Sequence, residues 1–169
     1  EECIATVREA VDLGITLLDM APSYGNGEAE SVVGAAFEGD LPSGIRVTTK
    51  HRLGETDPDK IEQNIRDGLG ESLKRLQLER VDLFFLHSNI IPHDFDASVF
   101  VTRPATRWWV YEEHFVPTCK KLVAEGKIGA WAITGIGVPE CLLAALDLDD
   151  KPAAVQCLSL IHISEPTRR

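Results

Sequence analysis

Short apolar segments alternate with amphipathic segments along most of the chain, and this alternation constrains the possible folds more than any other feature. The apolar segments read as strands, and the amphipathic ones repeat their apolar residues with a helical period. Strands that are apolar throughout need cover on both faces, which a parallel sheet packed between helices provides. The expected helices span residues 2–13, 28–38, 57–76, 112–124 and 139–146, and the expected strands span residues 15–18, 45–50, 81–87, 128–134 and 153–156.

Two architectures fit this order of elements, a doubly wound sheet and part of a (β/α)8 barrel. A complete barrel takes about 250 residues, whereas this chain has 169 residues and five candidate strands. As a barrel it is therefore incomplete. The first strand, residues 15–18, is expected to be buried, and residues 88–107 are expected to form a long irregular segment.

Composition narrows the functional classes. Hydrophobic residues make up 44% of the chain and charged residues 26%, which is typical of a soluble globular protein. An apolar stretch of the roughly 18 residues that a membrane span needs is absent, as is a basic leader before an apolar segment. The net charge of −10 is unfavourable for coating nucleic acid. We expect a cytoplasmic protein whose partner is a small molecule.

The cysteines match neither a zinc site nor a compact disulfide framework, because no C-x-x-C pair is present. We expect all of them to be buried free thiols in a reducing cytoplasm, and we expect no metal site. The residues concerned are Cys3, Cys119, Cys141 and Cys157.

Polar residues recur at the C-terminal end of each candidate strand. In parallel α/β folds this edge gathers the loops that carry catalysis. Side chains from successive strands are therefore expected to converge on one pocket. The residues at these ends are Asp19, Lys50, His87, Thr134 and Gln156, and Tyr24 follows Asp19 in the turn.

Four of these residues form a set with a specific chemical use. A tyrosine is a weak acid, with an ordinary pKa of about 10, but a nearby ammonium stabilises its phenolate and lowers that pKa. With Lys50 as the ammonium and Asp19 holding it, Tyr24 can protonate a carbonyl oxygen that gains negative charge. His87 can orient the carbonyl, and a cofactor can supply a hydride. Each residue alone also has a structural explanation: an ion pair, a loop tyrosine or a core histidine.

Residues 14–25 (GITLLDMAPSYG) resemble the signature of the aldo-keto reductase family, in which a glycine and Asp-x-Ala precede Tyr-Gly. The resemblance covers about residues 1–156, and linked motifs are more specific than any one alone. Further matches follow in order: Glu30 with Val33-Gly34, Thr49-Lys50, residues 72–76, residues 81–83 with Leu86-His87, and residues 125–128.

This resemblance implies a (β/α)8 barrel that binds NADPH or NADH without a Rossmann domain. It implies that Asp19, Tyr24, Lys50 and His87 are a catalytic tetrad, in an enzyme that interconverts a carbonyl (an aldehyde, ketone or aldose) and an alcohol. The rival interpretation is a barrel subunit that binds the nucleotide as a regulator without catalysis. Retention of all four tetrad residues argues against that rival.

The chain departs from the family pattern around the nicotinamide. Thr134 keeps a hydroxyl where the family usually has Gly-x-Ser-Asn, whereas Gly135 removes the amide side chain. Gln156 matches the glutamine that touches the nicotinamide amide. Residues 88–107 resemble the variable substrate loop, after which Trp108 and Trp109 either wall the substrate pocket or anchor the next helix. The Thr-Gly-Ile-Gly segment and this loop resemble the aldose dehydrogenases, the sugar-oxidising branch.

Both ends depart from a complete barrel. The first strand and the last strands are missing, so residues 1–157 form a partial barrel with about half of its strands. Residues 158–168 equal the in-frame translation of a transposon-end adapter used in sequencing libraries, and we expect residues 158–169 to be a non-native tail. The chain alone is expected to bind NADPH poorly, to have little activity and to aggregate through open edge strands.

Overall fold

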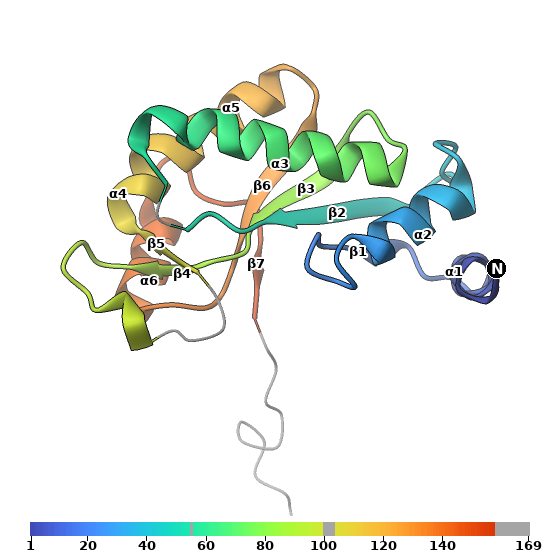
Figure 1. The fold of residues 1–169 in the computed structure, drawn as a ribbon, viewed down its shortest axis with the longest axis horizontal. Coiled ribbons are helices and arrows are strands. Elements are labelled where there is room, and N and C mark those ends of the chain that lie inside the picture. Colours follow the sequence, from blue (N-terminus) through green and yellow to red (C-terminus); the bar gives the residue numbers. More distant parts are fainter. Residues whose placement is uncertain (55, 100–103, 158–169) are drawn as a thin grey trace, which may run out of the picture.

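A five-stranded parallel sheet forms the centre of the molecule (Figure 1). The structure, a computed structural model, describes residues 1–54, 56–99 and 104–157. The strands lie side by side in chain order, whereas a doubly wound sheet reverses its order at a switch point. This confirms the barrel architecture. The strands are β1 (Leu17–Asp19), β2 (Arg46–His51), β3 (Val81–Leu86), β6 (Ile128–Thr134) and β7 (Val155–Gln156).

Helices connect successive strands, and α3 and α5 run alongside each other over one face of the sheet (Figure 1). Asp57 begins the third helical segment as predicted, because its carboxylate accepts a bond from the backbone N–H of Asp59. The helical segments are α1 (Glu2–Asp12), α2 (Glu28–Phe37), η1 (Pro58–Lys60), α3 (Ile61–Leu76), α4 (Trp108–Val110), the π-helical segment η3 (Tyr111–Phe115), α5 (Val116–Ala124) and α6 (Pro139–Asp147).

The hydrophobic core lies between the sheet and the helices. From the sheet, Val47, Phe84 and Leu86 are fully buried. They meet the apolar stripe of α3, whose buried residues are spaced at a helical period: Ile61, Ile65, Leu69, Leu73 and Leu76.

The sheet is strongly curved. β1 and β7 are its two edge strands, yet Nε2 of Gln156 on β7 donates a hydrogen bond to Oδ2 of Asp19 on β1 at 2.8 Å. An open, gently twisted sheet would hold the edges of five strands far apart, since neighbouring strands are about 4.8 Å apart. The described residues therefore form a curved, partial barrel wall, with the ends of β1 and β7 facing each other across its interior.

The first strand differs from the prediction. Only residues 17–19 form a strand, and Ile15 and Leu17 are about half exposed. β1 pairs with β2 alone, and α1 packs against α2, where Arg8 Nε donates to the carbonyl of Ala36. The prediction of a buried strand is confirmed for Leu18 but wrong for Ile15 and Leu17, because the segment lies at a sheet edge.

The segment expected to be irregular contains a second, small parallel sheet. Strand β4 (Asn89–Ile91) pairs with β5 (Ala105–Arg107), and a short 3-10 turn, η2 (Ala97–Val99), lies between them. Ile90 and Ile91 are fully buried, which explains why β4 forms regular structure. The following helix also begins earlier than predicted, at Trp108 instead of Glu112.

Cys119 and Cys141 are buried free thiols as expected, but Cys3 and Cys157 are exposed. The expectation of burial was wrong for these two because they lie near the two ends of the described residues, on α1 and after β7.

No helix among the described residues has the length and apolar character to cross a membrane. The expected non-native tail, residues 158–169, lies outside the described residues, so this expectation remains a prediction.

Candidate active site

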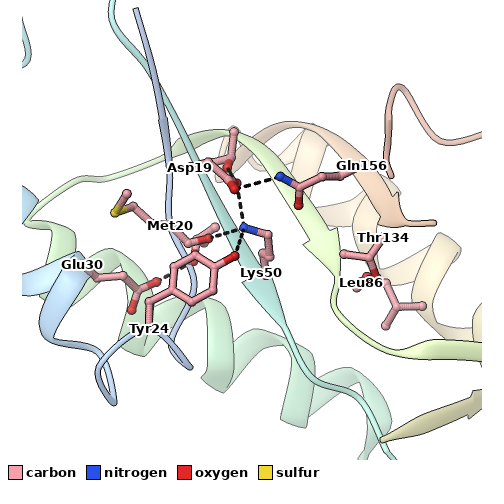
Figure 2. A network of polar contacts seen from close by, with 10 residues as sticks. Asp19, Met20, Tyr24, Glu30, Lys50, Leu86, Thr134 and Gln156 are labelled. Carbon is pink, nitrogen blue, oxygen red and sulfur yellow. Dashed lines mark hydrogen bonds and ion pairs between the residues drawn. The ribbon is translucent and has the colours of Figure 1, made fainter. Parts of the chain in front are cut away.

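Lys50 is the centre of the polar network at the C-terminal edge of the sheet (Figure 2). Its side chain is only 1% exposed. Its ammonium has three N–H donors and makes three hydrogen bonds: to Asp19 Oδ1 at 2.7 Å, to the carbonyl of Met20 at 2.9 Å and to Tyr24 Oη at 3.1 Å. The charge is thus buried, fully bonded and held in one direction.

Asp19, the last residue of β1, receives hydrogen bonds on both carboxylate oxygens. Besides Lys50, Thr48 donates to Oδ1 at 2.7 Å and Gln156 donates to Oδ2. Partial burial favours the neutral acid, but the hydrogen bonds from Lys50, Gln156 and Thr48 outweigh it and lower the pKa of Asp19. The group is therefore a carboxylate that fixes the ammonium.

Tyr24 lies in the turn between β1 and α2, and it is 39% exposed. Its oxygen accepts from Lys50, which leaves its own proton available for a substrate. The ring of His87, directly after β3, stands edge-on to the Tyr24 ring with the centroids 6.5 Å apart. The structure thus brings Asp19, Tyr24, Lys50 and His87 together around one point.

Thr134 and Gln156 are direct partners in the register between β6 and β7. Thr134 is buried and donates to the carbonyl of Leu86 at 3.0 Å. Gln156 is exposed and is bonded to Asp19 through its amide nitrogen. A Cβ at Gly135 would lie 2.5 Å from Sγ of the exposed Cys157, so a side chain there requires this thiol to move. The two polar side chains therefore stand together beside the tetrad.

Met20 and Tyr24 line one pocket, of about 580 Å³, together with residues of α1 and α2. Two further pockets bear on the predicted site residues. Lys50 and His87 line the smaller one, of about 330 Å³, together with Pro22 and Ser23. The larger pocket, of about 600 Å³, lies between the first turns of α4–η3 and of α6, and none of the four tetrad residues lines it. Its lining residues are Pro92, His93, Trp108, Trp109, Glu113, Glu140, Cys141 and Ala144.

For Trp108 and Trp109 the structure shows a place at the start of the helix and beside the larger pocket, while contact of either indole with a substrate stays a prediction. Each is half-buried at the start of the helix, and each walls the larger pocket. Nε1 of Trp108 also donates to Glu112 one turn on, at 2.8 Å. The structure does not place the two indoles in contact with the tetrad.

Thr48 and the carbonyl of Met20 were not among the predicted site residues, yet they complete the hydrogen bonding of Asp19 and Lys50. Thr48 was detectable, because it stands two residues before Lys50 on one strand and so shares its face. His51 faces the helices, where its ring bonds Asn64 at 2.9 Å and stacks on Phe84. Burial lowers the pKa of His51, against a smaller opposite effect of the Asn64 bond.

Comparison with known proteins identifies this arrangement. The sequence profile of the Aldo/keto reductase family matches residues 1–162. L-galactose dehydrogenase of Arabidopsis thaliana is 33% identical over 138 residues, which are 80% of this chain and 39% of that protein. D-threo-aldose 1-dehydrogenase of a Pseudomonas species is 29% identical over an alignment covering 94% of this chain and 55% of that protein.

Solved structures agree with the sequence comparison. An aldo-keto reductase from Klebsiella pneumoniae, crystallised in complex with NADPH, superposes with a TM-score of 0.69 and 28% identity, over 92% of this chain and 47% of that one. The chain thus spans about half the length, or less, of these relatives. The fold, the matched profile and the shared sequence together place this chain in the aldo/keto reductase family.

Proposed function

We propose that this chain carries the catalytic tetrad of an NAD(P)-dependent oxidoreductase that interconverts a carbonyl and an alcohol. The observation that carries the proposal is the ammonium of Lys50, which bonds both the carboxylate of Asp19 and the phenolic oxygen of Tyr24. Tyr24 is the general acid and base, Lys50 supports it, Asp19 anchors Lys50, and His87 orients the carbonyl.

The geometry accounts for each step that the protein performs. As a carbonyl oxygen gains negative charge, Tyr24 donates its proton to that oxygen, and the positive charge 3.1 Å away stabilises the phenolate left behind. Lys50 cannot turn away, because its other two N–H groups are held by Asp19 and by the carbonyl of Met20. In the oxidative direction Tyr24 takes the proton from the alcohol.

Thr134 and Gln156 have the donor and acceptor chemistry to hold the carboxamide of NADPH or NADH. The hydroxyl of Thr134 donates to Leu86 and so keeps its lone pairs for an N–H of the ligand. Gln156 donates through Nε2 to Asp19, which leaves its carbonyl oxygen as a second acceptor. When bound, the nicotinamide supplies or receives the hydride.

The proposed substrate is a small carbonyl compound, and we favour an aldose. Two of the relatives are named for sugar oxidation, L-galactose dehydrogenase and D-threo-aldose 1-dehydrogenase. Trp108 and Trp109 are proposed to contact the part of the substrate that extends beyond the tetrad, since indoles pack well on apolar faces of ligands. Trp109→Ala should then raise KM for the sugar more than it lowers kcat.

We also propose that activity requires a longer barrel than residues 1–157, with residues 158–169 a non-native tail. Support comes from the coverage of the relatives and from the half-exposed Ile15 and Leu17 at the sheet edge. A cytoplasmic location and the lack of a nucleic-acid partner are retained as predictions from the sequence.

The decisive experiment joins residues 1–157 to the remaining strands of the Klebsiella relative and measures aldose-dependent reduction of NADP⁺ or NAD⁺. The parent relative, assayed alongside, shows that the added strands are competent. Tyr24→Phe in the chimera should abolish turnover while NADPH binding, followed by nucleotide fluorescence, persists. Turnover that survives Tyr24→Phe would refute the role of the phenol.

The regulatory rival makes the opposite prediction. A chimera that folds and binds NADPH, but turns over no aldose, aldehyde or ketone with Tyr24 intact, would favour a nucleotide-sensing subunit over an enzyme. The ammonium of Lys50, with all three N–H groups bonded, favours catalysis over sensing. Nucleotide binding alone does not require a buried charge directed at an exposed phenol.

A further inference from the structure

A second buried charge lies close to the tetrad, on the helix-facing side of β2. The carboxylate of Glu30 on α2 is completely removed from solvent. It accepts a hydrogen bond from the hydroxyl of Thr49 and a charged one from Nε of Arg75 at 2.7 Å. A buried carboxylate is costly unless it is paired, so this contact must be made whenever α2 is docked.

The three partners come from three different elements. Thr49 precedes Lys50 on β2, with its side chain on the opposite face. Arg75 is in the last turn of α3, where its guanidinium also donates to Ser72 at 3.3 Å. Glu30 lies in the first turns of α2, six positions after Tyr24. The cluster thus joins the strand of Lys50 to the helix that follows Tyr24.

Arg75 also contacts the loop that carries Tyr24. A Cβ added to Gly27 would lie 2.8 Å from Cδ and Nε of Arg75, and Gly27 has a φ of +89°. Glycine is therefore needed both for the backbone conformation and for the close approach. The stem of Arg75 packs directly on the end of the turn, just before α2 begins.

The turn between Tyr24 and Glu30 is stiff enough to transmit this anchoring. Its backbone is closed by hydrogen bonds from Tyr24 N–H to Ala21 at 3.0 Å and from Glu28 N–H to Gly25 at 3.1 Å. The N–H of Ala29 further donates to the carbonyl of Tyr24 at 3.3 Å. A shift of α2 would therefore carry Tyr24 with it.

We propose that Glu30 is a positioning residue for the tetrad. With Thr49 and Arg75, it locks the start of α2 onto β2 and thereby sets the separation between Tyr24 and Lys50. The catalytic consequence rests on the function proposed above, whereas the geometric consequence does not, because it can be measured without turnover.

The chain contains only two tyrosines, so the test can use selective labelling. The chimera with ¹³C in its tyrosine rings gives signals from Tyr24 and from the buried Tyr111, and Tyr24→Phe and Tyr111→Phe assign them. Glu30→Gln keeps the shape of the side chain but removes its charge. We expect it to shift the Tyr24 signal, to leave the Tyr111 signal in place and to lower Tm by about 5 °C or more.

A second Arg–Glu pair of α3 provides the matched control. Arg66 makes a two-bond pair with Glu125 on the helix side away from the site, at 2.8 Å in both bonds. Glu125→Gln should leave the Tyr24 signal unchanged. If the shift caused by Glu30→Gln does not exceed that of Glu125→Gln, while Tm still falls, Glu30 is merely structural and the proposal is wrong.

Arg75→Lys keeps the positive charge but has a shorter side chain and no planar guanidinium to bond Glu30. If Glu30→Gln does not fold, Arg75→Lys is used for the same test. Its Tyr24 signal should move in the same direction and by less, and an unmoved signal would overturn the proposal. In the chimera, Glu30→Gln should lower kcat about tenfold or more with little change in KM for the nucleotide. A failure of the Tyr24→Phe experiment would refute the proposed function but leave this geometric result standing.

Discussion

The two faces of β2 use the same residue types for different purposes. On the barrel-interior face, the hydroxyl of Thr48 and the ammonium of Lys50 both bond Asp19. On the helix-facing side, the hydroxyl of Thr49 bonds Glu30, and His51 packs on Phe84. Each face contains a carboxylate held by a threonine and a cation, yet one carboxylate is a third exposed and the other is completely buried.

This difference in solvent access implies that one carboxylate mainly affects the stability of the fold and the other mainly affects activity. A carboxylate that keeps contact with water can lose a partner and be rehydrated, whereas a buried one cannot. Substitutions on the helix-facing side should therefore mainly lower the free energy of unfolding, and those on the interior face should mainly lower activity.

The largest effect is expected for the core of the helix-facing side. Phe84 is fully buried and stacks between His51 and Phe115, with ring centroids 6.3 Å apart in both pairs. Phe84→Ala should lower the free energy of unfolding by about 3–5 kcal/mol, because it removes apolar contacts and leaves a cavity. Urea denaturation measures this loss. Leu143→Ala, at an exposed position on α6, is the control and should cost less than about 0.5 kcal/mol.

On the interior face the dominant effect should be kinetic. Lys50→Met, in the chimera described above, should lower turnover about 100-fold or more, because Tyr24 loses the charge that stabilises its phenolate. Stability should change much less than for Phe84→Ala, since Asp19 keeps its bonds from Thr48 and Gln156 and is partly hydrated. If Lys50→Met lowers the free energy of unfolding as much as Phe84→Ala does, and the folded fraction keeps normal turnover, the two faces do not differ in the proposed way.

The two threonines offer the closest matched pair, since both can be replaced by isosteric valine. Thr49→Val should cost about 1.5–3 kcal/mol, because Glu30 stays buried with one donor fewer. Thr48→Val should cost about 1 kcal/mol or less and should raise the pKa of Asp19, which loses one of the donors that lower it. Urea denaturation and ¹³C NMR titration of the carboxyl groups test the two outcomes. Equal stability losses would remove the distinction between the faces.

The lowered pKa of Asp19 also determines how this residue's contribution to the free energy of unfolding changes with pH. Because its folded pKa is below the ordinary 3.8, the folded carboxylate contributes stability above that pH, and the contribution is lost as pH falls through the folded pKa. Thr48→Val raises the folded pKa and so should reduce the acid-dependent part of the unfolding free energy in this range.

Much of the fold was predictable because local patterns determined it. The apolar stripe of α3 and the apolar run Leu83–Leu86 of β3 each match one secondary structure. The polar strand ends identified the edge where Asp19, Lys50 and His87 meet. The period of 2 along β2 also accounts for His51, which lies on the face opposite Lys50. The resemblance to the family, and not the periodicity, selected the barrel over the doubly wound sheet.

Other features depend on contacts that no local pattern contains. The exposure of Leu17 follows from the position of β1 at an edge, and the pairing of β4 with β5 joins residues on either side of a long loop. The Gln156–Asp19 bond spans 137 positions and exists only because the sheet curves. Glu30 reads as an ordinary acid in the first turn of a helix, and only the docking of α3 shows that it is buried.

The smallest expected effect concerns His51, on the same face as Thr49, and it appears only as a dependence on pH. Burial holds the folded pKa of His51 below the ordinary 6.5, so the unfolded chain takes up a proton first as pH falls. The free energy of unfolding should therefore decline as pH drops below about 6.5, until the folded histidine also protonates, and His51→Gln should flatten this decline.

A substitution at Asn64 can shift the folded pKa of His51 upward and so test the same pH dependence in the opposite direction. Its Oδ1 lies 2.9 Å from Nε2 of His51, at a solvent-exposed position on α3. Asn64→Asp places a negative charge beside the ring, raises the folded pKa of His51 and should reduce the decline below pH 6.5 without removing the stacking on Phe84. Urea denaturation at pH 5.0 to 7.5 measures both variants. A decline that is the same in wild type, His51→Gln and Asn64→Asp would show that this histidine does not couple the helix-facing side to pH.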